Sequence, residues 1–387
     1  MKRLKLIGSR QRVRLVLSGL VMGLILVEIA ARVVTPITIK NWVQTLTGER
    51  RRECAVKDKL LHHGFLPNCK GMVKTWDFEV EIVTNSLGLR EREIELRKID
   101  GIYRVLILGD SFAQGWGVEQ KDRFSEQASR RLKERDGARV EIINAGVNSY
   151  TPILELEYWR TKGIKLEPDL VVLILDFSDL HDDYYYGGWR RHERLRQELL
   201  PGSLEPIKER VDREERWFDW LVDNSRLVSY VYTRAKGIWL GKNQQLGWEN
   251  LFTDWLIYER AMEWEGYDEA WNLPVANLVL MKEYLESQEI EMAVAVAPKG
   301  MFYENEWQAG REFAGFKLGE AYSWRPVRMI ENKLEKQGVE VLKWYESFLE
   351  AKAKPLFYDY DGHWTPAAHL IVAEQLTEYL EAIRKEF

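Results

Sequence analysis

The sequence predicts an α/β fold built on a doubly wound, five-stranded parallel sheet, because short apolar strands alternate with helical patterns from residue 104 onward. One of these strands, residues 169–177 (DLVVLILDF), is apolar without a break, which is typical of a strand covered by helices on both faces. The chain has 387 residues, of which 45% are hydrophobic, so it can bury a large core. We therefore expect one sheet between two layers of helices.

Each expected element follows from its own pattern. Strands are predicted at residues 104–110, 140–146, 169–177, 290–297 and 339–345. Helices are predicted at residues 122–135, 153–163, 273–288, 328–337 and 366–384. Residues 72–84 have the pattern of a strand pair that ends in the turn NSLG. The alternation breaks at 184–271, where charged residues, Tyr and eight of the 16 Trp fall, so we expect an inserted, Trp-rich helical subdomain there.

The N-terminus has the pattern of a membrane anchor. Residues 1–14 carry six basic side chains, and residues 15–34 (LVLSGLVMGLILVEIAARVV) are mainly apolar over a length that spans a bilayer, with Glu28 and Arg32 near the outer end. No A-x-A cleavage site follows, which favours a retained transmembrane signal anchor over a cleaved signal peptide. The positive-inside rule places residues 1–14 in the cytoplasm and the remaining chain on the extracytoplasmic, periplasmic side of the cell membrane. Residues 35–100 then form a membrane-proximal lead-in, and residues 101–387 the main domain.

Charge and cysteine content narrow the choice of partners. The formal net charge is −5, from 56 basic and 61 acidic residues, so nucleic acid is not an expected partner. Cys54 and Cys69 are the two cysteines, and in an oxidising compartment they could close one loop, with two unpaired thiols as the alternative. Neither a C-x-x-C nor an H-E-x-x-H motif occurs, so we expect no metal and no cofactor.

Small and polar residues follow the predicted strands at the edge where ligands bind in open α/β sheets. Three strands end in Gly109-Asp110-Ser111, in residues 144–149 (NAGVNS) and in residues 176–179 (DFSD). The segment after the last strand, residues 359–363 (DYDGH), precedes a Thr-Pro pair that is typical of a helix start. We expect these segments to meet along one rim.

Ser111 is a candidate nucleophile, with helix capping by Asp110 or Ser111 as the alternative. A nucleophilic serine needs a base, and the base needs a third group that holds its tautomer. Of the six histidines, His363 follows a carboxylate two residues back and stands immediately before the helix start. We therefore predict His363 as the base and Asp361 as its partner. The alternatives are Asp359 as the partner, and Asp179 with His181 as a second acid–base pair.

Four sequence blocks together resemble the SGNH/GDSL hydrolases, in particular membrane-anchored bacterial members with a long insertion. The blocks are LGDSFAQGWGV, NAGVNSYTPILELE, PDLVVLILDFSDLHDD and DGHWTPAAHLIVAEQL, and the match covers roughly residues 60–381. The resemblance implies a flavodoxin-like sheet, Ser111 as nucleophile, His363 as base and Asp361 as its support. It also implies an oxyanion hole made by the Ser111 N–H, an N–H of the second block and an Asn side chain of the third.

The sequence departs from the family pattern at two oxyanion positions. Ser149 occupies the second-block glycine position, although its N–H is still available and Gly146 is close by in sequence. Ser178 occupies the third-block Asn position, and a serine hydroxyl reaches less far than an amide. Loss of one oxyanion donor costs about a hundred- to a thousandfold in rate, so an active enzyme needs a replacement. Asn148 is a candidate for this missing donor.

The residues and the resemblance together predict an extracytoplasmic serine esterase or O-acyltransferase. The expected substrate is an acylated carbohydrate, with O-acetyl groups of a cell-envelope or exported glycan as the target, and the only other expected partner is the membrane. A hydrolase of lipid acyl esters is the first alternative. A catalytically weak member that acts as a binding or scaffold subunit in polysaccharide assembly is the second, motivated by Ser178.

Overall fold

The computed structural model describes residues 54–136, 139–200, 266–314 and 318–384, together with 18–19, 22–23, 26–28 and 50–52. The chain divides into two compact units, residues 1–48 with 214–245 and residues 49–213 with 246–387. In the first unit, the described residues 18–19, 22–23 and 26–28 are helical. Within the described part of the chain, no helix is long and apolar enough to cross a bilayer. The predicted anchor and most of the predicted insertion lie outside the described residues.

The second unit contains the predicted five-stranded sheet. Its strands are β6 (Tyr103–Gly109), β7 (Val140–Asn144), β8 (Leu170–Leu175), β9 (Glu291–Val296) and β10 (Glu340–Leu342). They lie in the order β10-β9-β8-β6-β7, and every neighbouring pair is parallel. Counted along the chain, this is the order 2-1-3-4-5 of a flavodoxin-like sheet, so the predicted topology is confirmed. Its switch point, where ligands bind in such folds, lies between β6 and β8.

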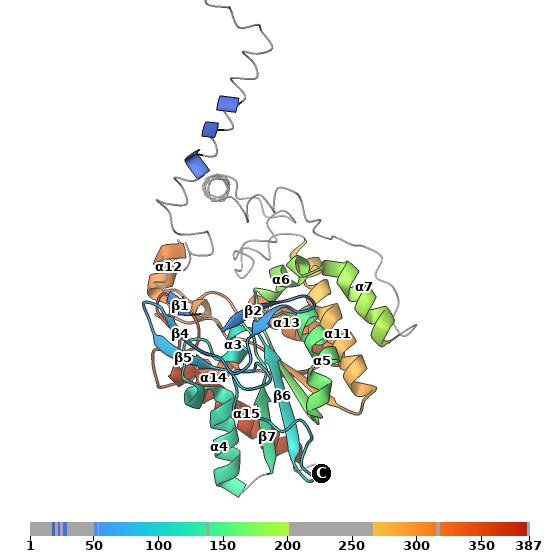
Figure 1. Cartoon of the computed structure of the whole chain (residues 1–387). Coiled ribbons are helices and arrows are strands. Elements are labelled where there is room, and N and C mark those ends of the chain that lie inside the picture. Colours follow the sequence, from blue (N-terminus) through green and yellow to red (C-terminus); the bar gives the residue numbers. More distant parts are fainter. Residues whose placement is uncertain are drawn as a thin grey trace, which may run out of the picture. The chain divides into compact units, whose positions relative to one another are not determined.

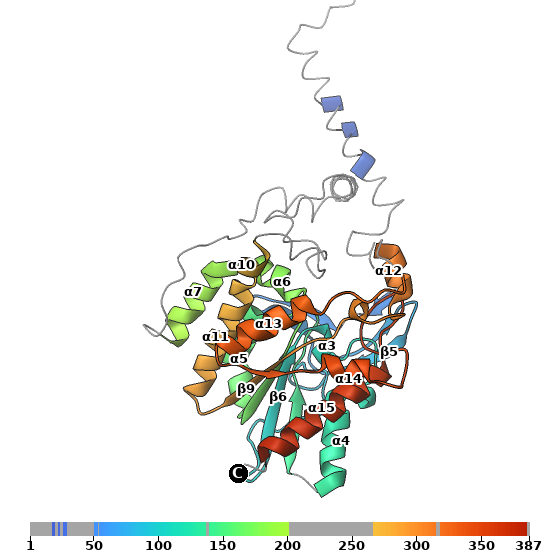
Figure 2. The same ribbon diagram turned by 180° about the vertical axis from the view of Figure 1, so that it is seen from behind.

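Helices cover both faces of this sheet, as Figures 1 and 2 show from opposite sides. The first layer contains α4 (Phe124–Asp136) and α15 (Pro366–Arg384), which pack against each other. The second contains α5 (Pro152–Thr161), α11 (Asn272–Glu286) and α13 (Arg325–Lys336). Shorter helices are α6 (Asp179–Tyr185), α7 (Gly188–Leu199), α10 (Tyr267–Ala270), α12 (Gln308–Ala314) and α14 (Tyr345–Leu349), and 3-10 turns are η1 (Gln120–Asp122), η2 (Gly163–Leu166) and η6 (Gly300–Phe302).

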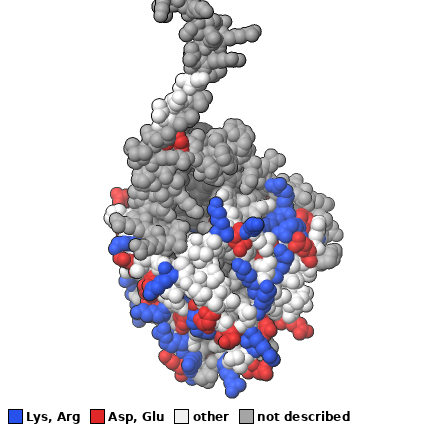
Figure 3. Space-filling view, in the orientation of Figure 1, with Lys and Arg blue, Asp and Glu red and all other residues white. Residues whose placement is uncertain are grey.

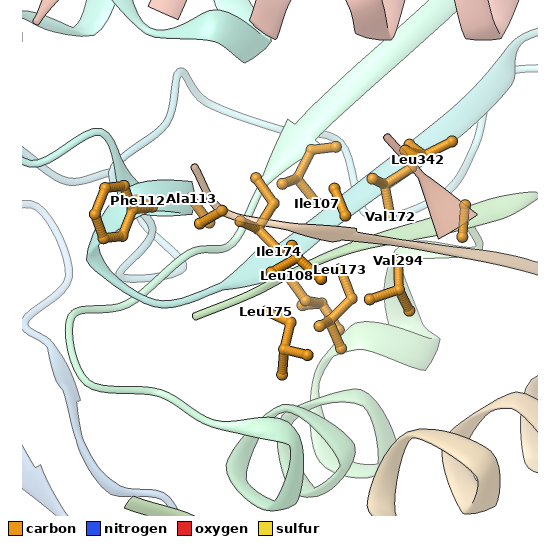
Figure 4. Packing of buried hydrophobic residues seen from close by; sticks show 14 of the residues in the cluster. Ile107, Leu108, Phe112, Ala113, Val172, Leu173, Ile174, Leu175, Val294 and Leu342 are labelled. Carbon is orange, nitrogen blue, oxygen red and sulfur yellow. The ribbon is translucent and has the colours of Figure 1, made fainter. Parts of the chain in front are cut away.

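The core lies between the sheet and these two layers. All six residues of β8 are buried, which explains why its sequence is apolar without a break. Figure 4 shows its side chains among those of β6, β9 and β10, with Phe112 and Ala113 at one end of the cluster. The surface seen in Figure 3 carries interspersed Lys, Arg, Asp and Glu side chains and no field of a single sign.

The lead-in contains two small sheets. In the first, β4 (Lys70–Lys74) pairs with β5 (Glu79–Val83) as a hairpin and with β1 (Arg50–Arg52) on its other edge. In the second, β2 (Ala55–Asp58) pairs with β3 (His62–Phe65). The structure pairs Cys54 with Cys69 in a disulfide, with their Cα atoms 5.7 Å apart. Of the two cysteine states considered from the sequence, the bonded one is therefore present.

Predicted and observed boundaries agree to within one to three residues for all ten elements of the main domain. The largest difference is in the last strand, where the sequence suggests seven residues and β10 has three. Its apolar pattern continues into Trp344 and Tyr345, which are buried but belong to the start of α14. A buried apolar residue that is not paired in a sheet gives the same sequence pattern as one within a strand. The sequence therefore could not show where β10 ends.

Candidate active site

Ser111 lies directly beyond β6, at the first residue of α3 (Ser111–Gln114). Asp110 is the cap of this helix, because its carboxylate accepts the Phe112 N–H at 2.8 Å. Gly109 makes the sharp turn possible: its φ is +143°, and a Cβ there would lie 2.7 Å from the Ala113 Cβ and 2.9 Å from the Ile174 carbonyl oxygen. The Ser111 hydroxyl is thereby not needed as the cap; its Oγ lies 3.3 Å from Asp110 Oδ2 and has a closer partner. The capping question raised by the sequence is answered in favour of Asp110.

That partner is His363. The Ser111 Oγ lies 2.7 Å from His363 Nε2, across 252 residues of sequence. His363 Nδ1 contacts Asp361 Oδ1 on the other side of the ring. The serine is buried, whereas the histidine side chain keeps 23% of its surface exposed. The structure therefore brings the three predicted residues together in the order hydroxyl, imidazole, carboxylate, and leaves the imidazole open to solvent.

The Asp361 carboxylate is held in its ionised form. Burial disfavours the charge, but His363 outweighs burial through its charge and its hydrogen bond, so the pKa of Asp361 lies below its ordinary value. Trp116 adds a second hydrogen bond, since its Nε1–H donates to Asp361 Oδ2 at 3.2 Å. An ionised carboxylate in this position fixes the imidazole tautomer that leaves Nε2 free to accept a proton.

The turn that carries Asp361 and His363 is held by the lead-in. At the tip of the β4–β5 hairpin, the Asp77 carboxylate accepts the N–H of Tyr360 at 3.1 Å and that of Asp361 at 2.8 Å. Phe78, the next residue, packs its ring against Tyr358 at 4.9 Å. The segment 35–100 was expected to lie near the membrane, and here part of it orients the acid of the triad.

A second contact holds the same turn from the other direction. Trp307 donates its Nε1–H to the Tyr360 carbonyl oxygen at 3.2 Å. Asp359, the alternative partner for the histidine, is occupied here instead: its Oδ1 accepts the Ala309 N–H at 3.0 Å, and its carbonyl accepts the Gly310 N–H at 2.8 Å. The choice of Asp361 over Asp359 therefore agrees with the geometry.

A buried ion pair lies on the other side of the nucleophile. Lys299 follows β9, and its Nζ lies 2.7 Å and 2.9 Å from the two carboxylate oxygens of Asp176. The same ammonium lies 4.4 Å from the centroid of the Phe112 ring, whose centroid is 4.7 Å from that of His363. Burial opposes ionisation of Asp176, but Lys299 outweighs it, so the pKa of Asp176 lies below its ordinary value.

Asp110 shows the opposite shift. Burial, reinforced by the neighbouring Asp176 carboxylate, raises the pKa of Asp110 to about 7. The site thus contains carboxyl groups with shifts of opposite sign: the triad acid and Asp176 are ionised at neutral pH, while Asp110 holds its proton more tightly than a free aspartate.

The oxyanion candidates fall into two groups. Three donors are already engaged: the Gly146 N–H donates to Asn144 Oδ1 at 3.0 Å, the Asn148 N–H to Gln114 Oε1 at 2.8 Å, and the Ser178 hydroxyl to Asp176 at 2.7 Å. Within the described part of the chain, no acceptor is found for the backbone N–H of Ser111 or Ser149, or for the side-chain N–H of Asn148. The Ser178 hydroxyl therefore does not stand in for an Asn side chain in this arrangement.

Ser149 has a backbone conformation that accounts for a glycine at this position in the resemblance. Its φ is +61°, in the left-handed region that favours glycine, and serine adopts it at a cost of roughly 1–2 kcal/mol. Ser149 thus has a backbone conformation that glycine adopts without strain.

The second acid–base pair considered from the sequence is not formed. Asp179 accepts the Asp176 N–H at 2.8 Å through Oδ2, and His181 Nδ1 contacts the neighbouring Asp182 at 2.5 Å. The carboxylate two residues before the histidine therefore faces the backbone of its own loop. Spacing alone did not distinguish this loop from the one that carries His363.

Sequence reasoning missed three residues that shape the site: Asp77, Trp116 and Lys299. A signal for Lys299 existed, since it follows a predicted strand at the functional edge, as Ser111 and Asp176 do. Asp77 lies at a hairpin tip, and the sequence carries no sign of which distant loop that tip meets.

Similar proteins were found among solved structures, at low sequence identity. No family model and no curated protein matches the sequence. The solved structures to which this chain is similar include acetyl xylan esterases and lipolytic proteins of the GDSL type. An acetyl xylan esterase is 11% identical, with 72% of this chain and 99% of that chain covered and a TM-score of 0.36. A GDSL-like lipase from Bacteroides thetaiotaomicron is 12% identical, with 74% and 91% covered and a TM-score of 0.35.

A catalytic mutant of an acetylxylan esterase from Geobacillus stearothermophilus is 13% identical to this chain. Here 73% of this chain and 95% of that chain are covered, with a TM-score of 0.35. Likenesses at this level carry no weight in assigning residue roles. Those roles depend on the distances between Ser111, His363 and Asp361.

Proposed function

We propose that this protein is a serine esterase that cleaves ester bonds with Ser111, His363 and Asp361. The observation that carries the proposal is the 2.7 Å contact between Ser111 Oγ and His363 Nε2, with Asp361 on the opposite ring nitrogen. Helix capping does not require a serine to contact a histidine that is itself bound to an aspartate. Asp110 already caps this helix.

The reaction follows from this geometry. His363 Nε2 takes the Ser111 hydroxyl proton as Oγ bonds to the ester carbonyl carbon, and the tetrahedral intermediate then expels the alcohol, which receives that proton. Water repeats the sequence on the acyl-serine: it gives a proton to His363, bonds to the carbonyl carbon, and releases the carboxylic acid as Ser111 recovers its proton. If a sugar hydroxyl replaces water in the second half, the same residues carry out acyl transfer.

Charge develops on the carbonyl oxygen during both halves of this reaction. The unengaged N–H groups of Ser111 and Ser149 and the Asn148 side chain are the donors best suited to it. In this proposal Asn148 supplies the amide that Ser178 lacks.

We further propose that the substrate is an acylated carbohydrate, with O-acetyl groups of a cell-envelope or exported glycan as the target. In this proposal residues 15–34 anchor the protein in a membrane, and the reaction takes place on the extracytoplasmic side. The resemblance of the four sequence blocks, the basic flank before the apolar segment and the 16 tryptophans support this part.

The test is acetate release by the purified full-length protein from 4-nitrophenyl acetate and from O-acetylated xylo-oligosaccharides. We expect release from both, and loss of at least about a thousandfold in kcat for Ser111→Ala. Release that continues unchanged in Ser111→Ala would contradict the mechanism.

Lipid acyl esters are the second candidate substrate, because an anchored enzyme works close to lipid. A series of 4-nitrophenyl esters from acetyl to octanoyl separates the two. Rates that rise with chain length favour lipid, and rates that fall favour acetyl groups.

A further inference from the structure

Two large aromatic side chains are exposed beside the triad. Trp76 is 67% exposed and Tyr360 is 50% exposed, although apolar rings of this size are usually covered. Tyr360 lies three residues before His363, and its N–H is bound by Asp77, the residue after Trp76. Trp76 therefore lies on the hairpin tip that contacts the turn 359–363, and Tyr360 lies within this turn, which we call the catalytic turn.

Trp76 is exposed on a well-supported turn. Thr75 Oγ1 accepts the N–H groups of Asp77 at 3.1 Å and Phe78 at 3.2 Å, and the Thr75 N–H donates to the Phe78 carbonyl at 2.8 Å. Phe78 packs inward, with its ring centroid 6.0 Å from that of Trp116. The backbone under Trp76 is thus fixed on both sides, and the indole projects from a rigid base. A turn that is already ordered loses little conformational freedom when a ligand stacks on the ring that it carries.

The surroundings of the two rings are polar and acidic. Lys74 and Glu79 form an exposed ion pair at 2.5 Å on either side of the hairpin tip. Asp77 follows Trp76 and Asp359 precedes Tyr360 in the sequence, and each carboxylate accepts a backbone N–H group. Carboxylates repel an anionic lipid surface. A site bordered by carboxylates also lacks the apolar surroundings that an acyl chain needs. Carboxylates are good acceptors for hydroxyl groups. An aromatic face with acceptors around it suits a pyranose ring, which is apolar on its C–H face and hydroxylated at its edge.

We propose that Trp76 and Tyr360 form a stacking subsite for the sugar rings of a glycan whose ester is presented to Ser111. This inference rests on the proposed function and names a surface that would recognise its carbohydrate substrate. The subsite lies on the lead-in and the catalytic turn, and the same hairpin that orients Asp361 carries one of its rings. Binding of a glycan and correct placement of the triad therefore share one structural element.

The experiment compares kcat/KM of the full-length protein on three substrates: an O-acetylated xylo-oligosaccharide, 4-nitrophenyl acetate and 4-nitrophenyl octanoate. For Trp76→Ala we expect the ratio of oligosaccharide to small acetyl ester to fall by about three- to tenfold, mainly through KM, because aromatic stacking contributes an energy of that size. Trp76→Phe keeps a ring and should keep the ratio within about twofold of wild type. Ile99→Ala is the matched control. Ile99 is 66% exposed, like Trp76, but it precedes the start of β6, whereas Ser111 follows the end of β6.

The outcomes are distinct. A lower ratio in Trp76→Ala, with Trp76→Phe and Ile99→Ala near wild type, supports the subsite. An unchanged ratio on a wild-type enzyme that does deacetylate the oligosaccharide overturns it and leaves the proposed function standing. A selective loss on the octanoyl ester would mean that the rings bind acyl chains, and overturns it as well. A wild-type enzyme that hydrolyses the small ester but no oligosaccharide contradicts the carbohydrate substrate itself, and the subsite with it.

Discussion

At the triad, burial and hydrogen bonding act on Asp361 in opposite directions, and hydrogen bonding prevails. A carboxylate whose pKa is lowered in the folded state stabilises the fold above its ordinary titration range, near pH 4, and that contribution is lost as the pH falls through this range. The same charge holds the histidine tautomer. In the proposed mechanism Asp361 therefore serves the reaction, and its lowered pKa contributes to stability at neutral pH.

Asp361→Asn tests the catalytic part of this account. We expect kcat to fall by about 10⁴-fold, the size of effect seen where an amide imposes the wrong histidine tautomer on a serine triad. Steady-state kinetics on 4-nitrophenyl acetate measures it. Asp359→Asn is the control and should stay within a few fold of wild type, because its contacts are to the backbone of residues 309 and 310. Equal losses in the two variants would mean that the turn as a whole, and not the Asp361 charge, matters.

Lys299→Met tests the ion pair beside the nucleophile. Removing the cation leaves a buried carboxylate on Asp176, so we expect the free energy of unfolding at pH 7 to fall by about 3–5 kcal/mol. In wild type the lowered pKa of Asp176 gives stability that is lost on acidification; without Lys299 burial raises that pKa, so the deficit of the variant should shrink as the pH falls. Urea denaturation at several pH values measures this. A double variant with Asp176→Asn that recovers nothing would contradict the account.

At the scale of elements, the β4–β5 hairpin and the turn 359–363 act as one unit. Asp77 binds two N–H groups of that turn, and Trp116 joins the Asp361 carboxylate to the small apolar cluster under the hairpin. This cluster includes Cys54, so the disulfide lies at the base of the unit. The lead-in is therefore part of the structure that holds the proposed triad.

Asp77→Ala tests this coupling. Without this carboxylate, the N–H groups of Tyr360 and Asp361 lose the oxygen that accepts both of them. We expect kcat to fall by roughly ten- to a hundredfold with little change in KM on a small ester, because small displacements of catalytic groups cost rates of this order. Asp77→Asn keeps one acceptor oxygen and should recover much of the loss. If Asp77→Ala loses stability but keeps its kcat, the hairpin supports the fold and does not position the triad.

The elements also show how far the sequence could predict the structure. Apolar strands such as β8 and helices with caps are local patterns, and their positions and order were correct. The pairing of Ser111 with His363 was predictable because strand ends of a doubly wound sheet meet at one edge. The contact of Asp77 with Asp361 was not, because it depends on how the lead-in packs on the main domain, and no periodicity records that. Ser178 was correctly singled out, but its hydrogen bond to Asp176 depends on a residue seen only in three dimensions.

At the scale of the whole molecule, the interior of the main domain contains several buried carboxyl groups. Burial raises the pKa of Glu155 and Asp179 well above their ordinary values, and that of Asp183 to about 6. Neither carboxyl oxygen of Glu155 has a hydrogen-bond partner in the part of the chain that the structure describes. The unfolded chain releases these protons near pH 4, so between pH 4 and pH 7 the folded state binds more protons than the unfolded state. The contribution of these three groups to stability therefore falls as the pH rises through this window.

Glu155→Gln tests this pH dependence. We expect the decline in unfolding free energy between pH 5 and pH 7 to become shallower by up to about 1.4 kcal/mol per pH unit, the limit for one group. The slope across pH is the diagnostic quantity, since the amide shifts the absolute stability for its own reasons. Urea denaturation at half-unit pH steps measures it. An identical slope in wild type and variant would mean that Glu155 is ionised in the folded protein.

The central claim is that Ser111 is an activated nucleophile, and covalent labelling of the purified protein with a fluorescent fluorophosphonate tests it most directly. The account predicts labelling of the wild type, none in Ser111→Ala, and labelling slowed by at least about a hundredfold in His363→Ala, since a serine without its base reacts slowly. Absence of labelling in a folded wild type, or labelling that survives in Ser111→Ala, would contradict it.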